Sequence, residues 1–266
     1  MPQLKSTIEI LKMLDQSNCG ECREKTCLAF AAAVFTGRRQ LRECPHLDRA
    51  LVRQYEGNID IRTAKGQELE ERLEILKRNL SAIDFQEAAR RLGGRVSENQ
   101  LILKVCGKDF RIDSDGNFSS EIHVHAWLTV PVLNYIIKGK GLDPSGEWVP
   151  FRELKGGKDW ILFFRHRAEK SLKKVADEYT DLFHDMLYIF NGKQVENHYE
   201  SDISLVLYPL PKIPILFCYW RPDDGLDSDL HVFFDATAAD NLPAGSLYSL
   251  MMGLVIMFEK VAQRHG

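Results

Sequence analysis

Four cysteines near the N-terminus constrain this chain more than any other feature. Cys19, Cys22, Cys27 and Cys44 follow the spacing C-x2-C-x4-C-x16-C. A cubane iron–sulfur cluster needs four thiolates that converge from one tight loop and one returning segment, because each sulfur must reach a different iron. The spacing therefore indicates a metal or cluster site, and the surrounding segment must fold so that the four sulfurs meet.

A structural zinc site is the alternative that four cysteines always raise. Such sites usually take two short C-x2-4-C hooks. The first three cysteines could form two hooks only by sharing Cys22, and Cys44 has no close partner of its own. The spacing favours a cluster over zinc and leaves both open.

The local sequence predicts how the cysteine loop is held. Ser6 and Glu9 form a capping-box pattern, which predicts a short helix over 6–15. Residues 16–26 then form a loop in which Asn18 and Gly20 can take unusual backbone angles. A second helix is expected over 28–35, beginning at about Cys27, so that its N-terminal N–H groups face the thiolates. We expect a module over residues 1–50 that is small enough for the metal to hold it together.

The rest of the chain has a different character. Residues 51–80 are charged and helix-prone and predict a helical connector, with an apolar stripe of Leu69, Leu73 and Leu76. Asp84 is expected to cap a further helix that runs through Leu92 and ends at Gly93.

Residues 81–266 predict a mixed domain. A hairpin is expected around Gly107-Lys108, between strands over 100–106 and 108–113. Further patterns predict helices over 127–137, 168–191 and 245–263, and strands over 204–208, 213–220 and 230–235. Because strands and helices show no regular βαβ rhythm, the predicted fold class is α+β: a helical metal module, a helical connector and a mixed domain.

A second cluster of potential ligands lies inside this domain. In an extended segment Glu121, His123 and His125 would share one face, since strand side chains alternate. Two imidazoles and a carboxylate could bind a metal, but a polar strand face with hydrogen-bonded histidines is the simpler interpretation. Cys106 and Cys218 lie in apolar strands and are expected to be buried and inert.

Composition excludes several classes of function. A net charge of −3 and a pI of about 6.3 do not indicate a nucleic-acid binder. No signal peptide opens the chain, and the longest apolar run, 247–258, is too short to span a bilayer. Cysteines crowded into one segment of such a chain favour metal binding in a reducing cytoplasm over disulfides. Arg38, Arg39 and Arg42 lie close to Cys44 and form either a solvated helix end or a docking patch for an acidic partner.

The N-terminal segment resembles a known family at Asn18-Cys-Gly-Glu-Cys22, Cys27-Leu-Ala-Phe-Ala31 and Cys44-Pro45. It is similar to the iron–sulfur domain of the corrinoid iron–sulfur protein large subunit, which is the gamma subunit of acetyl-CoA decarbonylase/synthase, and to that of the Rnf complex B subunit. The resemblance covers about residues 5–50. It implies a [4Fe–4S] cluster bound by Cys19, Cys22, Cys27 and Cys44. Arg23 departs from the glycine that is common in such loops.

Residues 80–266 look like an uncharacterised domain that follows this cluster motif in proteins of anaerobic bacteria and archaea. The likeness rests on 147–151, 210–214 and 233–238. No Asp-x-His-x-x-Gly motif occurs anywhere in the chain, which argues against a corrinoid site of that type here.

These observations together predict a cytoplasmic iron–sulfur protein of an anaerobe that transfers single electrons to a redox partner, near corrinoid or one-carbon metabolism. The chain is expected to be an accessory protein more than an enzyme. Two alternatives remain: an interaction or ligand-binding module whose cluster is only structural, and an enzyme with its site in residues 81–266. The sequence does not specify an oligomeric state.

Overall fold

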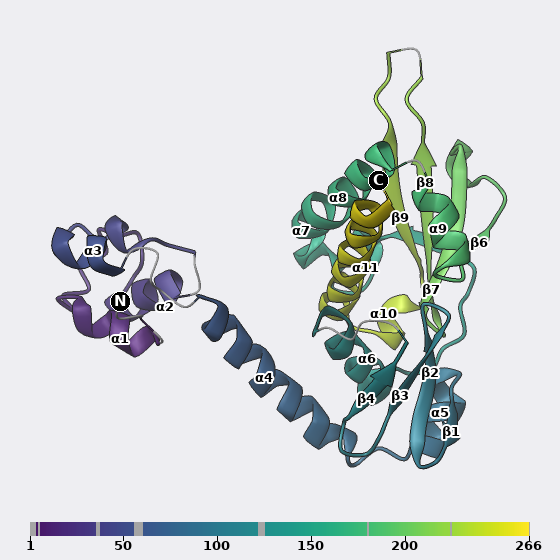
Figure 1. Ribbon diagram of the computed structural model, residues 1–266, viewed down its shortest axis with the longest axis horizontal. Coiled ribbons are helices and arrows are strands. Elements are labelled where there is room, and N and C mark those ends of the chain that lie inside the picture. The colour runs from purple at the N-terminus through teal and green to yellow at the C-terminus, as the bar shows by residue number, and fades with distance from the viewer. Residues whose placement is uncertain are drawn as a thin grey trace. The chain divides into compact units, whose positions relative to one another are not determined.

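The structure, a computed structural model, describes residues 4, 6–35, 38–55, 61–121, 126–179, 181–223 and 225–265, with only the backbone for 61–70, 126 and 265. The chain divides into two compact units, Met1–Glu74 and Ile75–Gly266. The division falls inside helix α4 (Ile61–Leu80), which is drawn in blue in Figure 1. The separate connector that we expected over 51–80 therefore stays a prediction.

The first unit is helical. Its elements are α1 (Thr7–Met13), α2 (Cys27–Phe35), the 3₁₀ turn η1 (Leu41–Glu43), α3 (Arg49–Tyr55) and the first part of α4. The N–H of Glu9 donates to the hydroxyl of Ser6 at 3.2 Å, which confirms the predicted cap of α1. Helix α2 begins at Cys27, as its sequence predicts. Gly37, a residue type that commonly ends helices, follows α2 in the sequence and lies outside the described residues.

The second unit begins with a helix and a small antiparallel sheet. Asp84 caps α5 (Phe85–Leu92) by accepting a 2.8 Å hydrogen bond from the N–H of Gln86, and Gly93 ends the helix with a φ of 76°. The sheet that follows has the strand order β1-β2-β3-β4. Its strands are β1 (Arg95–Ser97), β2 (Gln100–Val105), β3 (Lys108–Ile112) and β4 (Phe118–Ser120).

The hairpin between β2 and β3 is present, but its turn lies one residue earlier than predicted. Val105 pairs with Lys108, so the two central residues are Cys106 and Gly107, with φ values of 48° and 80°. Two-residue turns of this kind need positive φ at both central positions, which suits glycine and strains most other residues. Turn propensity alone therefore did not predict that Cys106 occupies the first central position of the turn.

A second antiparallel sheet forms the larger part of this unit, in the order β5-β9-β8-β7-β6 (Figure 1). Its strands are β5 (Trp148–Pro150), β6 (Lys193–Gln194), β7 (Ile203–Leu210), β8 (Ile213–Trp220) and β9 (Asp229–Asp235). The three long strands contain the three predicted β runs. Leu205, Phe217 and Val232 are register partners and are buried on one face.

Helices complete the second unit. They are α6 (Ala126–Lys138), α7 (Ile161–Phe164), α8 (Lys170–Glu178), α9 (Leu182–Tyr188), α10 (Ala238–Asn241) and α11 (Ala244–His265). Short turns are η2 (Phe151–Glu153), η3 (Gly157–Asp159), η5 (His198–Glu200) and the π-helical turn η4 (Arg165–Glu169). Helix α11 packs against α6 and α8 (Figure 1). The chain has the predicted α+β fold.

Helix α11 is long and apolar enough to cross a membrane by length and composition, and among the described residues it is the one such candidate. More than half of the apolar window is buried inside the protein. Its fully buried side chains include those of Leu247, Leu250, Met251 and Phe258. These contacts identify α11 as a core helix, and the apolar run 247–258 lies inside it.

A buried carboxylate fastens the loop before β5 to the end of β9. The side chain of Asp235 is fully buried and accepts hydrogen bonds from the N–H groups of Ser145, Gly146 and Thr237 at 3.1, 2.7 and 3.0 Å. Burial alone would raise the pKa of Asp235, but hydrogen bonds from Thr237, Ser145 and Gly146 outweigh it and hold the pKa below its usual value. The charged form is therefore the one that the fold stabilises.

Candidate metal centre

The loop between α1 and α2 carries the first three cysteines. Gln16, Asn18, Gly20 and Arg23 all have positive φ, between 54° and 77°. Positive φ values within a loop can turn backbone N–H groups toward its inside, where these groups can face an anion. Arg23 stands at a position that favours glycine, yet its side chain is exposed and its N–H closes a turn onto the carbonyl of Gly20 at 2.9 Å. The loop therefore accommodates the arginine.

Asn18 holds Cys27 at the start of α2. The N–H of Cys27 donates to the side-chain oxygen of Asn18 at 2.8 Å, and the N–H of Asn18 donates to the Cys27 sulfur at 3.4 Å. Thr26 supplies a further cap, since its hydroxyl accepts from the N–H of Ala29 at 3.0 Å. A thiolate at this position gains from the positive end of the helix dipole and from one direct N–H···S bond.

Three of the four thiols lie inside the core of the first unit. Cys22, Cys27 and Cys44 are buried and belong to one cluster of packed side chains that also contains Phe30 and Leu41. Burial raises the pKa of the Cys44 thiol, while hydrogen bonds from the N–H groups of His46 and Leu47 oppose that rise. Cys19, in contrast, is exposed. The four predicted ligands therefore consist of three inner sulfurs and one at the surface.

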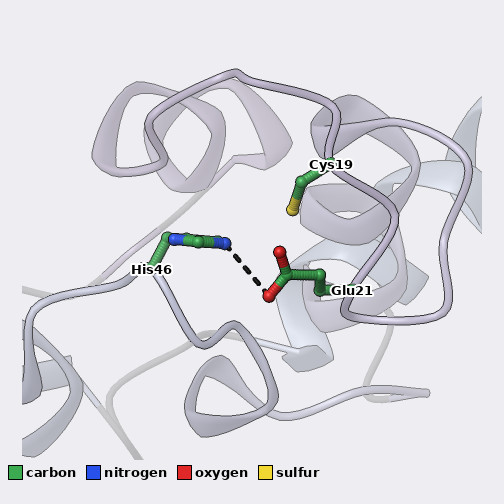
Figure 2. Close-up of side chains that lie close together, drawn as sticks. All are labelled: Cys19, Glu21 and His46. Carbon is green, nitrogen blue, oxygen red and sulfur yellow. Dashed lines mark ion pairs between the residues drawn. The ribbon is translucent and has the colours of Figure 1, made fainter.

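Two further residues lie beside the exposed cysteine. Figure 2 shows Cys19, Glu21 and His46 facing one another, with all three ligand atoms within 4.8 Å of each other. A carboxylate oxygen of Glu21 and Nε2 of His46 are 3.2 Å apart. Sequence reasoning missed this pair, although Glu21 lies inside the first C-x2-C and His46 follows Cys44 by two residues. A sulfur, an oxygen and a nitrogen form a donor set that zinc accepts.

The arginines near Cys44 are engaged within the first unit. Arg39 forms ion pairs with Glu24 at 3.5 Å and with Glu43 at 3.0 Å. The hydrogen bond that Arg39 donates to Glu43 raises the pKa of Arg39. Arg38 and Arg42 also interact with other residues. A docking patch that relies on these charges stays a prediction.

The other predicted sites have separate outcomes. Glu121 is exposed directly after β4, and His123 and His125 lie outside the described residues. The second metal site therefore stays a prediction. Cys106 and Cys218 are buried, as expected. Burial raises the pKa of the Cys106 thiol to about 12, and it also raises the pKa of Cys218, so both stay protonated at neutral pH.

The segment that carries the four cysteines is similar to known proteins. Residues 14–46 match the family described as "Putative Fe-S cluster". Over 43 residues the chain is 46% identical to the corrinoid/iron-sulfur protein large subunit of Moorella thermoacetica. Over 45 residues it is 42% identical to acetyl-CoA decarbonylase/synthase complex subunit gamma 1 of Methanosarcina thermophila. These matches cover 16% and 17% of this chain and a tenth of each relative. They support an iron–sulfur cofactor for the first unit.

The larger unit defines the family. Residues 84–257, well over half of the chain, match the model named "Domain of unknown function (DUF3786)", and the chain belongs to this family. No solved structure gives a significant match. The family name assigns no reaction to the second unit.

Proposed function

We propose that this chain binds one [4Fe–4S] cluster through Cys19, Cys22, Cys27 and Cys44 and exchanges single electrons with a partner protein. The observation that carries the proposal is the arrangement of the four sulfurs. Three are enclosed in the core of the first unit, and the fourth lies at its surface. A bound cluster would supply a one-electron redox couple, and the exposed Cys19 would place one edge of it within reach of a partner.

The local structure supports the binding of an anionic cluster. Cys27 begins α2, and the N–H of Asn18 already donates to its sulfur. Hydrogen bonds to sulfur and the degree of exposure are the protein's means of setting a cluster potential. Asn18 therefore has two roles in the proposal: it positions Cys27 and it stabilises negative charge on the sulfur.

The spread of the sulfurs favours a cluster over a single zinc ion. Zinc–sulfur bonds of about 2.3 Å in a tetrahedron bring four sulfurs to about 3.8 Å from one another. Among the described residues, the one set of three ligand atoms that lie within 4.8 Å of each other is that of Cys19, Glu21 and His46. No three of the four cysteine sulfurs form such a set among the described residues, so their spacing is wider than a single tetrahedral zinc ion requires.

The names of the relatives suggest the metabolic setting. The matched proteins are subunits of a corrinoid/iron-sulfur protein and of the acetyl-CoA decarbonylase/synthase complex. We infer a partner of the same kind: a corrinoid or one-carbon enzyme in the cytoplasm of an anaerobe, whose cofactor this protein keeps reduced. Because the match covers a tenth of each relative, the partner is inferred from the cluster segment alone.

The decisive experiment is anaerobic reconstitution followed by iron and sulfide analysis and EPR of the dithionite-reduced protein. We expect about four irons and four sulfides per chain and a signal that disappears on oxidation. Cys27→Ala and Cys44→Ala should each lose most of the iron, whereas Cys218→Ala, which also removes a buried thiol, should retain it. One zinc per chain and no sulfide would contradict the proposal.

Redox titration separates electron transfer from a purely structural cluster. Three of the four cysteines belong to the core of the first unit, so a bound cluster would stabilise that unit in either case. A cluster that accepts one electron reversibly within the biological range supports electron transfer. A cluster that stays oxidised at every accessible potential supports the structural alternative. Cobalt or iron that binds to a cysteine variant without a cluster would instead favour a site at Glu121, His123 and His125.

A further inference from the structure

A cavity of about 350 Å³ lies in the second unit, between the β2–β3 hairpin and the segment that joins α9 to β7. Its walls are formed by Lys104, Gly107, Lys108, Tyr188, Ile189, Asn191, Tyr208 and Pro211. Its volume falls in the range of ligand pockets, which is about 300–1,000 Å³. Neither the iron–sulfur segment nor the family name assigns it a role, and its properties do not depend on the proposed cluster.

The fold holds the two walls together. The N–H of Cys106, in the hairpin turn, donates to the carbonyl of Pro209 in β7 at 3.2 Å, and β2 contacts β7 (Figure 1). Gly107 approaches Asn191 so closely that a Cβ on the glycine would lie 2.5 Å from the Cβ of Asn191. The cavity is therefore formed between two anchored elements, and glycine at 107 is what permits their contact.

The charge of the cavity is positive. Two of its wall residues are lysines and none is acidic, although the whole chain carries a net charge of −3. Lys104 pairs with Asp109 at 2.8 Å, but Arg95 also pairs with the same carboxylate, at 2.6 Å. One carboxylate cannot neutralise two cations, so positive charge remains beside the cavity. Lys108 adds a further ammonium that forms no ion pair with any described residue.

Aromatic side chains beside the lysines provide surfaces on which a planar ring can stack. Tyr188 is 74% exposed and Ile189 is 42% exposed, which leaves a large apolar surface open beside the lysines. His184 lies against the ring of Tyr188, with centroids 4.3 Å apart. The ammonium of Lys193 lies 5.5 Å from the ring centroid of Tyr208 on the other wall. Exposed tyrosine faces beside cations are the combination that stacks planar rings and pairs with phosphates.

We propose that this cavity binds a nucleotide, with the phosphate paired to Lys104 and Lys108 and the base stacked against Tyr188. The two lysines provide charge-assisted hydrogen bonds to the phosphate oxygens, and none of the residues that line the cavity is acidic. The exposed ring of Tyr188 accepts any base, because stacking does not depend on hydrogen-bond pattern. The ligand class is a small phosphate ester that carries a flat ring.

Isothermal titration calorimetry of the full chain tests this assignment with AMP, GMP, CMP and UMP, each compared with its nucleoside and with inorganic phosphate. We expect at least one nucleotide to bind with a Kd below about 1 mM. Its nucleoside and phosphate alone should each bind at least tenfold more weakly. Affinity should fall as salt rises, because part of the binding is ionic. Failure of all four nucleotides to bind, or equal binding by phosphate alone, would overturn the proposal.

Variants assign the binding to the cavity. The double variant Lys104→Gln, Lys108→Gln should weaken nucleotide affinity at least tenfold, whereas Lys155→Gln, an exposed lysine elsewhere in the unit, should leave it unchanged. Tyr188→Ala should weaken it at least fivefold and Tyr188→Phe should retain it, since phenylalanine keeps the ring. Tyr188 is mostly exposed, so its removal should not alter the thermal unfolding midpoint. Nucleotide affinity that survives the double variant would place binding elsewhere and refute the assignment.

Discussion

Replacing Asn18 separates the two contributions that this residue makes to holding Cys27, a proposed cluster ligand: a side-chain hydrogen bond and a backbone conformation. Its side-chain oxygen accepts from the N–H of Cys27 at 2.8 Å, and its backbone has a φ of 54°. Glycine at this position removes the hydrogen bond but tolerates the backbone angle, at a cost of about 1 kcal/mol. Alanine removes the bond and also takes an unfavourable backbone conformation, which adds about 1–2 kcal/mol.

The assay is the rate at which reconstituted protein releases iron to a chelator under anaerobic conditions. Because release requires the loop to open, these costs convert to rates at tenfold per 1.4 kcal/mol. We expect Asn18→Gly to release iron about fivefold faster than the wild type and Asn18→Ala at least thirtyfold faster, since 2 kcal/mol is about a factor of thirty. The difference between the two variants isolates the backbone contribution.

Asn99 offers a matched control. It also has positive φ, at 60°, and is exposed, but it lies in the β1–β2 turn of the second unit. Asn99→Ala should carry a similar backbone cost and leave the release rate unchanged. If Asn18→Ala releases iron within twofold of the wild-type rate, the side chain of Asn18 does not secure Cys27 and the reasoning fails.

Three further predictions follow from charged side chains. Asp235→Asn should lower the free energy of urea unfolding by about 2–4 kcal/mol, because a buried N–H donor then loses its charged acceptor. Since its folded pKa is depressed, the contribution of Asp235 should be present above about pH 4 and lost as pH falls through the folded pKa. The pKa of His231 is raised, first by Glu169, whose carboxylate lies 3.7 Å from Nδ1, and also by the charge of Asp229, so its stabilising contribution should be complete below about pH 6.5 and lost as pH rises through the folded pKa. NMR titration of the imidazole should show this pKa fall in Glu169→Gln. Asp15→Asn should raise the reduction potential of the proposed cluster by at most a few tens of millivolts in a redox titration, because the exposed Asp15 carboxylate lies 3.9 Å from the Cys27 sulfur and its charge is screened.

Local chemistry explains which elements the sequence predicts well. Ser6 and Asp84 each precede a helix that they cap with their own side chain, and Gly93 ends one with positive φ. These features involve neighbours three or four residues apart, so their patterns are complete within a short window. Strands β1 and β4 have three residues each, which is too few for a period of two to be recognised in the sequence. Their existence depends on pairing with β2 and β3, which a local pattern does not contain.

The two candidate sites differ in how far their residues lie apart in the sequence. This difference explains why the sequence indicated the cysteine site and not the cavity. Cysteines are rare and chemically specialised, so four of them in 26 residues identify a metal site before any contact is known. The nucleotide cavity uses lysine, tyrosine and glycine, which are common on any surface. Its walls meet where Gly107 contacts Asn191, 84 positions further along the sequence, and its positive charge arises because the Asp109 carboxylate is shared between cations. A site made of common residue types is defined by which of them come together, and that is decided only when the chain folds.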